Sequence, residues 1–108
     1  MPVYKLIVLS RPIEGMEAEY NDWYDNRHLS DVLAVPGFVS AERCGPAPVE
    51  RFMDTTGSGQ YLAIYTIESE NVEQALADLK GRSNGPQMPL SPALDRGALK
   101  TFLFETRS

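Results

Sequence analysis

The sequence predicts an α+β fold, and three observations carry this prediction. Segments with strand periodicity alternate with two amphipathic helical segments. Their order along the chain is strand, helix, strand, strand, helix, strand, which is the split βαβ arrangement of ferredoxin-like folds. A length of 108 residues suits one compact domain. We therefore expect a ferredoxin-like βαββαβ sandwich over residues 1–108, with a four-stranded antiparallel sheet and two helices on one face.

The first half of the chain reads as a strand, a helix and a second strand. Residues 3–9 mix β-branched, aromatic and aliphatic side chains and predict the first strand. From about residue 15 to residue 28, apolar and aromatic side chains recur every three or four positions, which predicts an amphipathic helix. Ser30 resembles a new N-cap, so we expect a bend near Leu29 and a short second helical turn. Residues 38–44 read as the second strand.

The second half repeats the pattern with a longer connection. Residues 60–67 predict the third strand, after a loop that contains Gly57-Ser58-Gly59. Residues 71–80 predict the second helix, with Ser69 as a possible cap and Gly81 as a stop. Residues 82–97 contain three prolines and should form an ordered loop, and loops of this length often act as lids. Residues 99–106 close the sheet.

The third strand indicates how the sheet is covered. Tyr61 and Tyr65 share one face of this strand, and Leu62 and Ile64 share the other. If Leu62 and Ile64 pack under the helices, the tyrosines lie on the opposite face. That face would be exposed in a monomer, so we expect a second copy to cover it in a homodimer. The parity of the sheet also decides whether Arg43 faces the cleft or the dimer contact.

Composition excludes several classes of function. The net charge is −5, with 10 basic and 15 acidic residues, which opposes binding to nucleic acid. No apolar run approaches the ~20 residues of a membrane span, and no signal-peptide pattern is present, so we expect a cytoplasmic protein without membrane contact. Cys44 is the only cysteine and His28 the only histidine, which excludes an internal disulfide and a structural zinc site. The sequence has no phosphate-binding motif, so we expect no cofactor.

One segment carries most of the candidate chemistry, because residues 23–31 hold the only Trp and the only His of the chain. On an ideal helix Tyr20, Tyr24 and His28 form an i, i+4 ladder at the margin of the buried face. With a pKa near ~6.5, imidazole is a natural general base or acid at neutral pH. Asp25 and Asp31 each lie three residues away and could orient it.

The residues alone leave alternatives open for each of these side chains. His28 could instead cap a helix end, where the dipole favours a cation. Trp23 belongs to the apolar stripe and could also form a cleft wall. The hydroxyl of Tyr24 needs a partner, which could be protein or substrate. Arg27 could hold a substrate oxygen, stack on Trp23 or pair with a surface acid.

The run WYDNRHLSDVLAVPGFVSAER resembles the Trp-Tyr-Asp-x-x-His-x-Pro pattern, followed by Pro-Gly-Phe, of EthD-like proteins in the dimeric α+β barrel superfamily. YLAIYTIES and MPLSPALD are similar to the same group. One departure is Ser30, where the pattern usually has Pro. The resemblance implies a homodimer with two sheets packed back to back and a ligand cleft between the helices and the sheet of each subunit. The superfamily includes cofactor-independent isomerases, cyclases, small monooxygenases and haem-handling proteins.

Two classes of function follow from these observations. The first is a small cofactor-independent enzyme of isomerase, cyclase or lyase type. In it His28 moves a proton on a hydrophobic carbonyl or aromatic small molecule, with Tyr24 and Asp31 assisting. Trp23, Arg27 and Asp25 would then contact the ligand. The second is a non-catalytic protein that binds a small hydrophobic ligand in the same cleft, with a monooxygenase or haem-handling protein as a weaker alternative.

Overall fold

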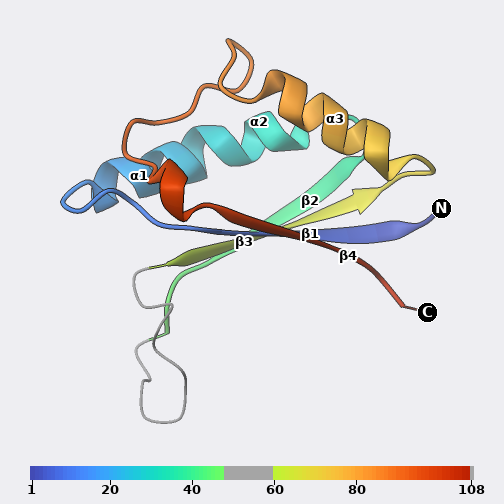
Figure 1. Cartoon of the computed structure of the whole chain (residues 1–108), viewed down its shortest axis with the longest axis horizontal. Helices are drawn as coiled ribbons and strands as arrows, with labels where there is room; N and C mark the ends of the chain where they lie inside the picture. The colour runs from blue at the N-terminus through green and yellow to red at the C-terminus, as the bar shows by residue number, and fades with distance from the viewer. Residues whose placement is uncertain (48–59, 108) are drawn as a thin grey trace.

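The computed structural model describes residues 1–47 and 60–107, and it has the predicted ferredoxin-like α+β architecture. Four antiparallel strands form one sheet in the order β2-β3-β1-β4, and all the helices lie on one side of it (Figure 1). The strands are β1 (Val3–Ser10), β2 (Phe38–Cys44), β3 (Tyr61–Glu68) and β4 (Lys100–Glu105). The predicted strands are therefore confirmed to within one or two residues. The glycine-containing loop predicted before β3 lies outside the described residues.

The first helical segment is longer and straighter than the sequence predicts. It runs without interruption through α1 (Glu17–Trp23), the π-helical turn η1 (Tyr24–His28) and α2 (Leu29–Leu33). The predicted bend at Leu29 is wrong, because Leu29 has helical φ and ψ of −58° and −44°. Ser30 caps no helix in this structure. Unlike proline, it keeps its backbone N–H, so the helical ladder can continue through this position.

The second helix, α3 (Val72–Arg82), begins at its cap and ends at an extended residue. The side chain of Asn71, and not that of Ser69, accepts a hydrogen bond from the backbone N–H of Gln74, at 3.1 Å. Ser69 instead accepts from the N–H of Asn71. Gly81 lies inside the helix, which stops only at Ser83, where ψ is 130°. The predicted helix is confirmed, while its cap and its stop are corrected.

The structure settles the parity of the sheet, which the sequence left open, and places the tyrosines of β3 on the side of the helices. Tyr65 is 1% exposed and faces the helices, together with Ala63 and Ile67. Tyr61 lies on the same side, with its ring 5.4 Å from that of Tyr20. The core explains this choice, because the aromatic side chains of α1 and η1 stack against the tyrosines of β3. The outer face carries the other residues of the strand, Leu62 and Ile64.

The connection between α3 and β4 is ordered and packs against the rest of the molecule. It contains a short 3-10 turn, η2 (Arg96–Ala98), and no α-helix. An isolated bridge joins Leu94 to Pro12, and the N–H of Ile13 donates to the carbonyl of Ala93 at 2.7 Å. Met88 and Ala93 are fully buried. In Figure 1 this orange segment passes across the helical layer before it returns to the sheet.

The helices that the structure describes were expected not to cross a membrane. None of them combines the length and the apolar character needed to cross a bilayer.

Candidate active site

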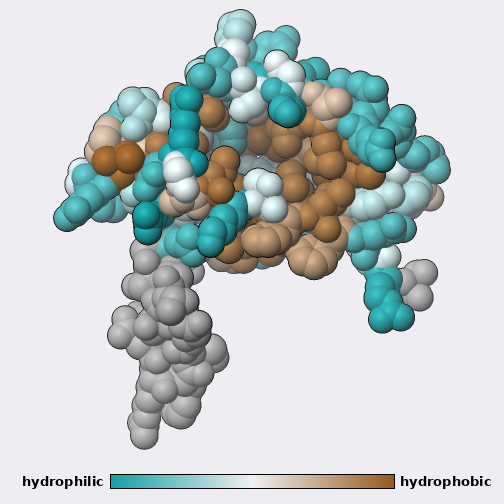
Figure 2. Space-filling view, viewed as in Figure 1, coloured by the Kyte–Doolittle hydropathy of each residue, from teal (hydrophilic) through white to brown (hydrophobic). Residues whose placement is uncertain are grey.

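An apolar cavity of about 140 Å³ lies between the helical layer and the sheet. Figure 2 shows hydrophobic residues gathered in the hollow between these two layers, with hydrophilic residues around it. Side chains from the sheet, from the first helical segment, from α3 and from the 83–99 connection line this cavity. They are Leu6, Val8, Trp23, Tyr24, His28, Val32, Tyr65, Leu79, Ser83, Met88, Leu90, Leu94, Leu99 and Thr101. Three of the sequence-predicted site residues, Trp23, Tyr24 and His28, are therefore brought together.

The π-helical turn η1 arranges these three side chains. Such turns occur mostly as short insertions in α-helices and are frequent at functional sites. Here the wider turn stacks the ring of Trp23 on that of His28, five residues later, with centroids 4.5 Å apart and an angle of 27° between the ring planes. The ring of Tyr24 meets the same imidazole edge-on at 5.0 Å. His28 is thus enclosed by two aromatic rings at the wall of the cavity.

This enclosure changes the proton affinity of His28. Burial lowers the pKa of the imidazole from 6.5 to about 4; the charge of Asp31 acts in the opposite direction, and that of Arg43 lowers the pKa further. Nδ1 is buried and has no hydrogen-bond partner among the described residues. His28 is therefore neutral at pH 7, and Nδ1 is not held by a backbone group, as helix capping would require.

Hydroxyl groups accompany the imidazole in the core. The Tyr65 hydroxyl donates to the Tyr24 hydroxyl across 3.5 Å. The Tyr20 hydroxyl shares a short hydrogen bond with Ser10. Burial raises the pKa of all three phenols, so each keeps its proton at neutral pH. Because Tyr24 accepts from Tyr65, its own proton is free to be donated to a ligand oxygen.

The three predicted site residues that carry charge lie outside the cavity lining. Arg27 Nε donates to Asp31 Oδ2 at 2.8 Å, in an i, i+4 ion pair on the helix. Asp25 is 58% exposed and pairs with Arg43. Neither carboxylate has a hydrogen bond to His28 in the part of the chain that the structure describes. Asp31 reaches His28 through its charge alone, which raises the imidazole pKa.

Arg43 lies on the helix-facing side of the sheet. The sequence had not decided between this side and the outer face that a second copy would cover. Its guanidinium carbon is 4.2 Å from the centroid of the Tyr24 ring, close enough for a cation–π contact. Nη1 donates to Asp25 at 2.7 Å, and Nη2 donates to Asn21 at 3.1 Å. The side chain is only 10% exposed. Arg43 therefore joins the sheet to the first helical segment and does not line the cavity.

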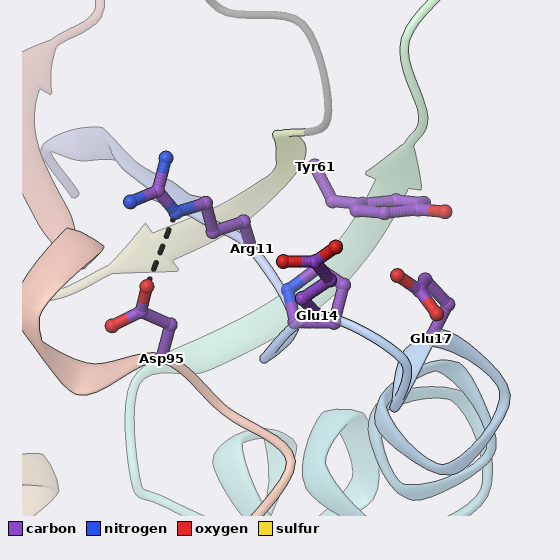
Figure 3. Close-up of a pocket in the computed structure, with 6 residues that line it drawn as sticks. Arg11, Glu14, Glu17, Tyr61 and Asp95 are labelled. Atoms are coloured by element: carbon purple, nitrogen blue, oxygen red, sulfur yellow. Dashed lines mark hydrogen bonds and ion pairs between the residues drawn. The ribbon is translucent and has the colours of Figure 1, made fainter.

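A second, polar hollow lies at the start of the first helical segment, where Arg11, Glu14, Glu17, Tyr61 and Asp95 surround it (Figure 3). Three of its four charged side chains, those of Arg11, Glu17 and Asp95, already have partners within the protein. Arg11 Nε donates to Asp95 at 3.1 Å, and Glu17 accepts from the backbone N–H of Gly15 at 3.2 Å. Within residues 1–47 and 60–107, no cluster of three His, Cys, Asp or Glu side chains is arranged to hold a metal. The apolar cavity is thus the better candidate for a ligand site.

Sequence reasoning missed the cavity residues of the 83–99 connection. Met88, Leu90 and Leu94 are apolar residues in a proline-rich segment, and their spacing there follows neither helical nor strand periodicity. Tyr65 of β3 was left undecided between the cleft and the dimer contact, because both faces of its strand are apolar. The run of apolar residues between the prolines is the one signal that this loop packs inward.

Comparison with known proteins identifies relatives in fold. No protein-family model matches the sequence, and no curated protein sequence matches it significantly. The structure is similar to that of an ethyl tert-butyl ether D (EthD) family protein from Bacillus halodurans C-125. The two are 19% identical, with a TM-score of 0.63 over 99% of this chain and 100% of the other.

Two further solved structures share the fold. One is the haem degrader MhuD from Mycobacterium tuberculosis, which has two haems bound in its active site. It is 20% identical, with a TM-score of 0.61 over 97% of this chain and 95% of the other. The other is SnoaB, a cofactor-independent oxygenase from Streptomyces nogalater, in a mutant form. It is 12% identical, with a TM-score of 0.54 over 98% of this chain and 92% of the other. At these identities the likeness establishes the fold, which hosts several chemistries.

Proposed function

We propose that this protein is a small cofactor-independent enzyme of isomerase, cyclase or lyase type that acts on a hydrophobic carbonyl or aromatic molecule. The observation that carries the proposal is that His28, a neutral imidazole, lines an apolar cavity while its buried Nδ1 has no hydrogen-bond partner among the residues that the structure describes. Unsatisfied buried polar atoms are rare in folded proteins and call for an explanation. A ligand that occupies the cavity beside His28 supplies one.

The proton transfer would use the side chains at this wall. Neutral His28 takes a proton from a carbon next to a carbonyl group, which leaves an enolate and an imidazolium. Tyr24 donates its free hydroxyl proton in a hydrogen bond to the enolate oxygen. The charge of Asp31, held by Arg27, stabilises the imidazolium. Return of the proton to a different carbon isomerises the substrate, and Trp23 forms the wall against which its ring lies.

Hydrogen–deuterium exchange tests this proposal without knowledge of the natural substrate. Monocyclic carbonyl compounds, acetophenone and phenylacetaldehyde, are incubated with the protein in D2O, and loss of the α-proton signal is followed by NMR. We expect the protein to accelerate exchange and His28→Gln to reduce the acceleration by about 100-fold or more. Tyr24→Phe should reduce it less, and Met16→Ala, outside the cavity, should leave it unchanged. Equal acceleration by the His28 variant and the wild type would exclude His28 as the base.

A second candidate function is binding of a small hydrophobic ligand without catalysis. It is favoured by the absence of a hydrogen-bonded carboxylate at His28 in the described residues, since Asp31 pairs with Arg27 and Asp25 with Arg43. A base of low pKa is also a weak one. The exchange experiment separates the two candidates. Probes that bind in the cavity but exchange no faster than in buffer would favour the binding protein.

Haem handling, a weaker alternative, fits the residues poorly. The cavity of about 140 Å³ is far smaller than a haem, and the imidazole of His28 is stacked on Trp23 and enclosed by Tyr24. We therefore derive no step through haem. The cofactor-independent oxygenase SnoaB shares the fold, which leaves oxygenation open as chemistry for the same cavity.

We further propose that the protein is a homodimer whose sheets pack back to back. The outer face of the sheet is apolar across three neighbouring strands. Cross-strand pairing places Ile7 beside Ile64 on one side and beside Phe102 on the other. Phe102 is 45% exposed and Phe104 58% exposed. An exposed apolar patch of this kind on a sheet face is typical of a protein interface.

A further inference from the structure

Met88 occupies an unusual position for a loop residue. It lies in the connection between α3 and β4, yet it is only 1% exposed and lines the apolar cavity. Loops run mostly over the surface, and a fully buried loop side chain indicates that the loop is packed in place. Met88 therefore forms part of the cavity wall that His28 and Tyr24 also line.

The backbone around Met88 holds this side chain in position. A tight turn is closed by two hydrogen bonds, from the N–H of Asn84 to the carbonyl of Met88 at 2.9 Å and from the N–H of Met88 to the carbonyl of Gly85 at 3.1 Å. Asn84 adopts the left-handed region, with φ of 62°, which asparagine tolerates better than most residues. The turn is thus a defined structure with its backbone polar groups satisfied.

A side chain of the candidate site fastens the next residue. Trp23 Nε1 donates to the carbonyl of Pro89 at 3.0 Å. The same indole stacks on His28. The loop that carries Met88 and the helix that carries His28 are therefore joined through one side chain.

The size of the cavity limits the ligand that it can enclose. Its volume is about 140 Å³, and its walls are mostly aliphatic and aromatic. An engineered apolar cavity of about 150 Å³ in another protein encloses benzene. A single six-membered ring with one small substituent fits this volume, whereas part of a compound with two fused rings would extend out of it through the open side of the cavity. Met88 is flexible and unbranched, so shortening it enlarges the cavity with little need for other groups to move.

We propose that the cavity selects monocyclic hydrophobic compounds and that Met88 sets this upper limit of size. The proposal rests on the proposed function in one respect, namely that this cavity is the ligand site. It goes beyond that function because it names the class of ligand by size and assigns its selection to a residue on the loop.

The test measures binding and not turnover. Toluene and naphthalene are titrated into the protein, and their dissociation constants are determined by NMR from the shifts of the tryptophan and methyl signals. We expect the wild type to bind toluene at least 10-fold more tightly than naphthalene. Met88→Ala should bind naphthalene at least 10-fold more tightly than the wild type does. Met16→Ala, which removes the same atoms outside the cavity, should keep the wild-type preference.

Two results would overturn the proposal. One is a wild type that binds naphthalene as tightly as toluene, and the other is a ratio of affinities that Met88→Ala leaves unchanged. Met88→Val, a smaller step in the same direction, provides the measurement if the alanine variant does not fold. A protein that shows the size preference but no dependence of proton exchange on His28 would contradict the proposed catalysis and leave the size limit standing.

Discussion

The state of His28 follows from its neighbours and not from its residue type. A solvated imidazole has a pKa near ~6.5 and is half protonated close to neutral pH. In this protein burial between Trp23 and Tyr24 opposes the charged form more strongly than Asp31 favours it, and the pKa falls to about 4. The side chain is thus available as a proton acceptor over the whole physiological range of pH.

This lowered pKa predicts a pH-dependent stability. Between about pH 6.5 and pH 4 the unfolded chain binds a proton at His28 and the folded protein does not, so the free energy of unfolding decreases as the pH falls through this window. From pH 7 to pH 4.5 the wild type should lose about 2 kcal/mol more than His28→Gln, which has no imidazole to titrate. Urea denaturation of both proteins at the two pH values measures the difference.

The comparison between the two proteins removes the contribution of the carboxylates, which titrate in both. A direct check follows the Hε1 resonance of His28 by NMR as the pH is lowered in the folded state. An inflection near pH 6.5, together with parallel loss of stability in the two proteins, would show that the imidazole is well solvated and contradict the prediction.

At the scale of the secondary-structure elements, the site depends on a π-helical turn that the sequence pattern did not reveal. The order of strands and helices along the chain was predictable because the apolar periodicities of strands and helices differ. The turn at Tyr24–His28 was not, because the residues fit an ordinary α-helix equally well. Its consequence is local, since the i, i+4 ladder placed Tyr24 beside His28 correctly and missed the stacking of Trp23.

The parity of β3 could not be predicted for a related reason. Both faces of this strand are apolar enough to be buried, so the alternation of Tyr65 with Ile64 did not decide which side meets the helices. The decision comes from aromatic packing with Tyr20 and Tyr24, which belong to a different element. Likewise, the inward turn of Met88 depends on contacts that are distant in the sequence. Local patterns therefore predicted the elements, while the cavity depends on how the elements meet.

The N-terminus of α3 provides a test of helix capping in this fold. The side chain of Asn71 accepts from the N–H of Gln74 at 3.1 Å, and this bond satisfies one of the free donors of the first turn. Asn71→Ala should lower the free energy of unfolding by about 1 kcal/mol. Asn71→Asp should keep the cap, so its free energy of unfolding should stay within about 0.3 kcal/mol of the wild-type value. Chemical denaturation monitored by circular dichroism measures both.

Equal stability of Asn71→Ala and the wild type would indicate that another group, such as Ser69, caps the helix when Asn71 is shortened. The double replacement of Asn71 and Ser69 by alanine distinguishes this case, because it removes both oxygen acceptors near the first turn.

At the scale of the whole molecule, the helices cover only one face of the sheet, and no element of the described residues covers the other face. The helix-facing side holds the buried core and the cavity. The outer face presents Ile7, Ile64 and the phenylalanines of β4. Burial of such apolar area contributes about 25 cal/mol per Å², so a second copy that covers this face would stabilise the fold. Dimerisation would leave the cavity in each subunit on the opposite side of its own sheet.

Phe104→Glu tests the homodimer. Phe104 is 58% exposed, and its cross-strand neighbour on β1 is Lys5, which can pair with the new carboxylate in a monomer. In a back-to-back dimer the same carboxylate would lie in an apolar interface, where an incompletely paired charge is costly. We expect the wild type to have twice the chain mass by light scattering and Phe104→Glu to have the mass of one chain at the same concentration. Leu33→Glu, which adds the same charge at a 38% exposed position on α2, should remain dimeric. A wild type with the mass of one chain, or dissociation of both variants alike, would argue against the outer face as the interface.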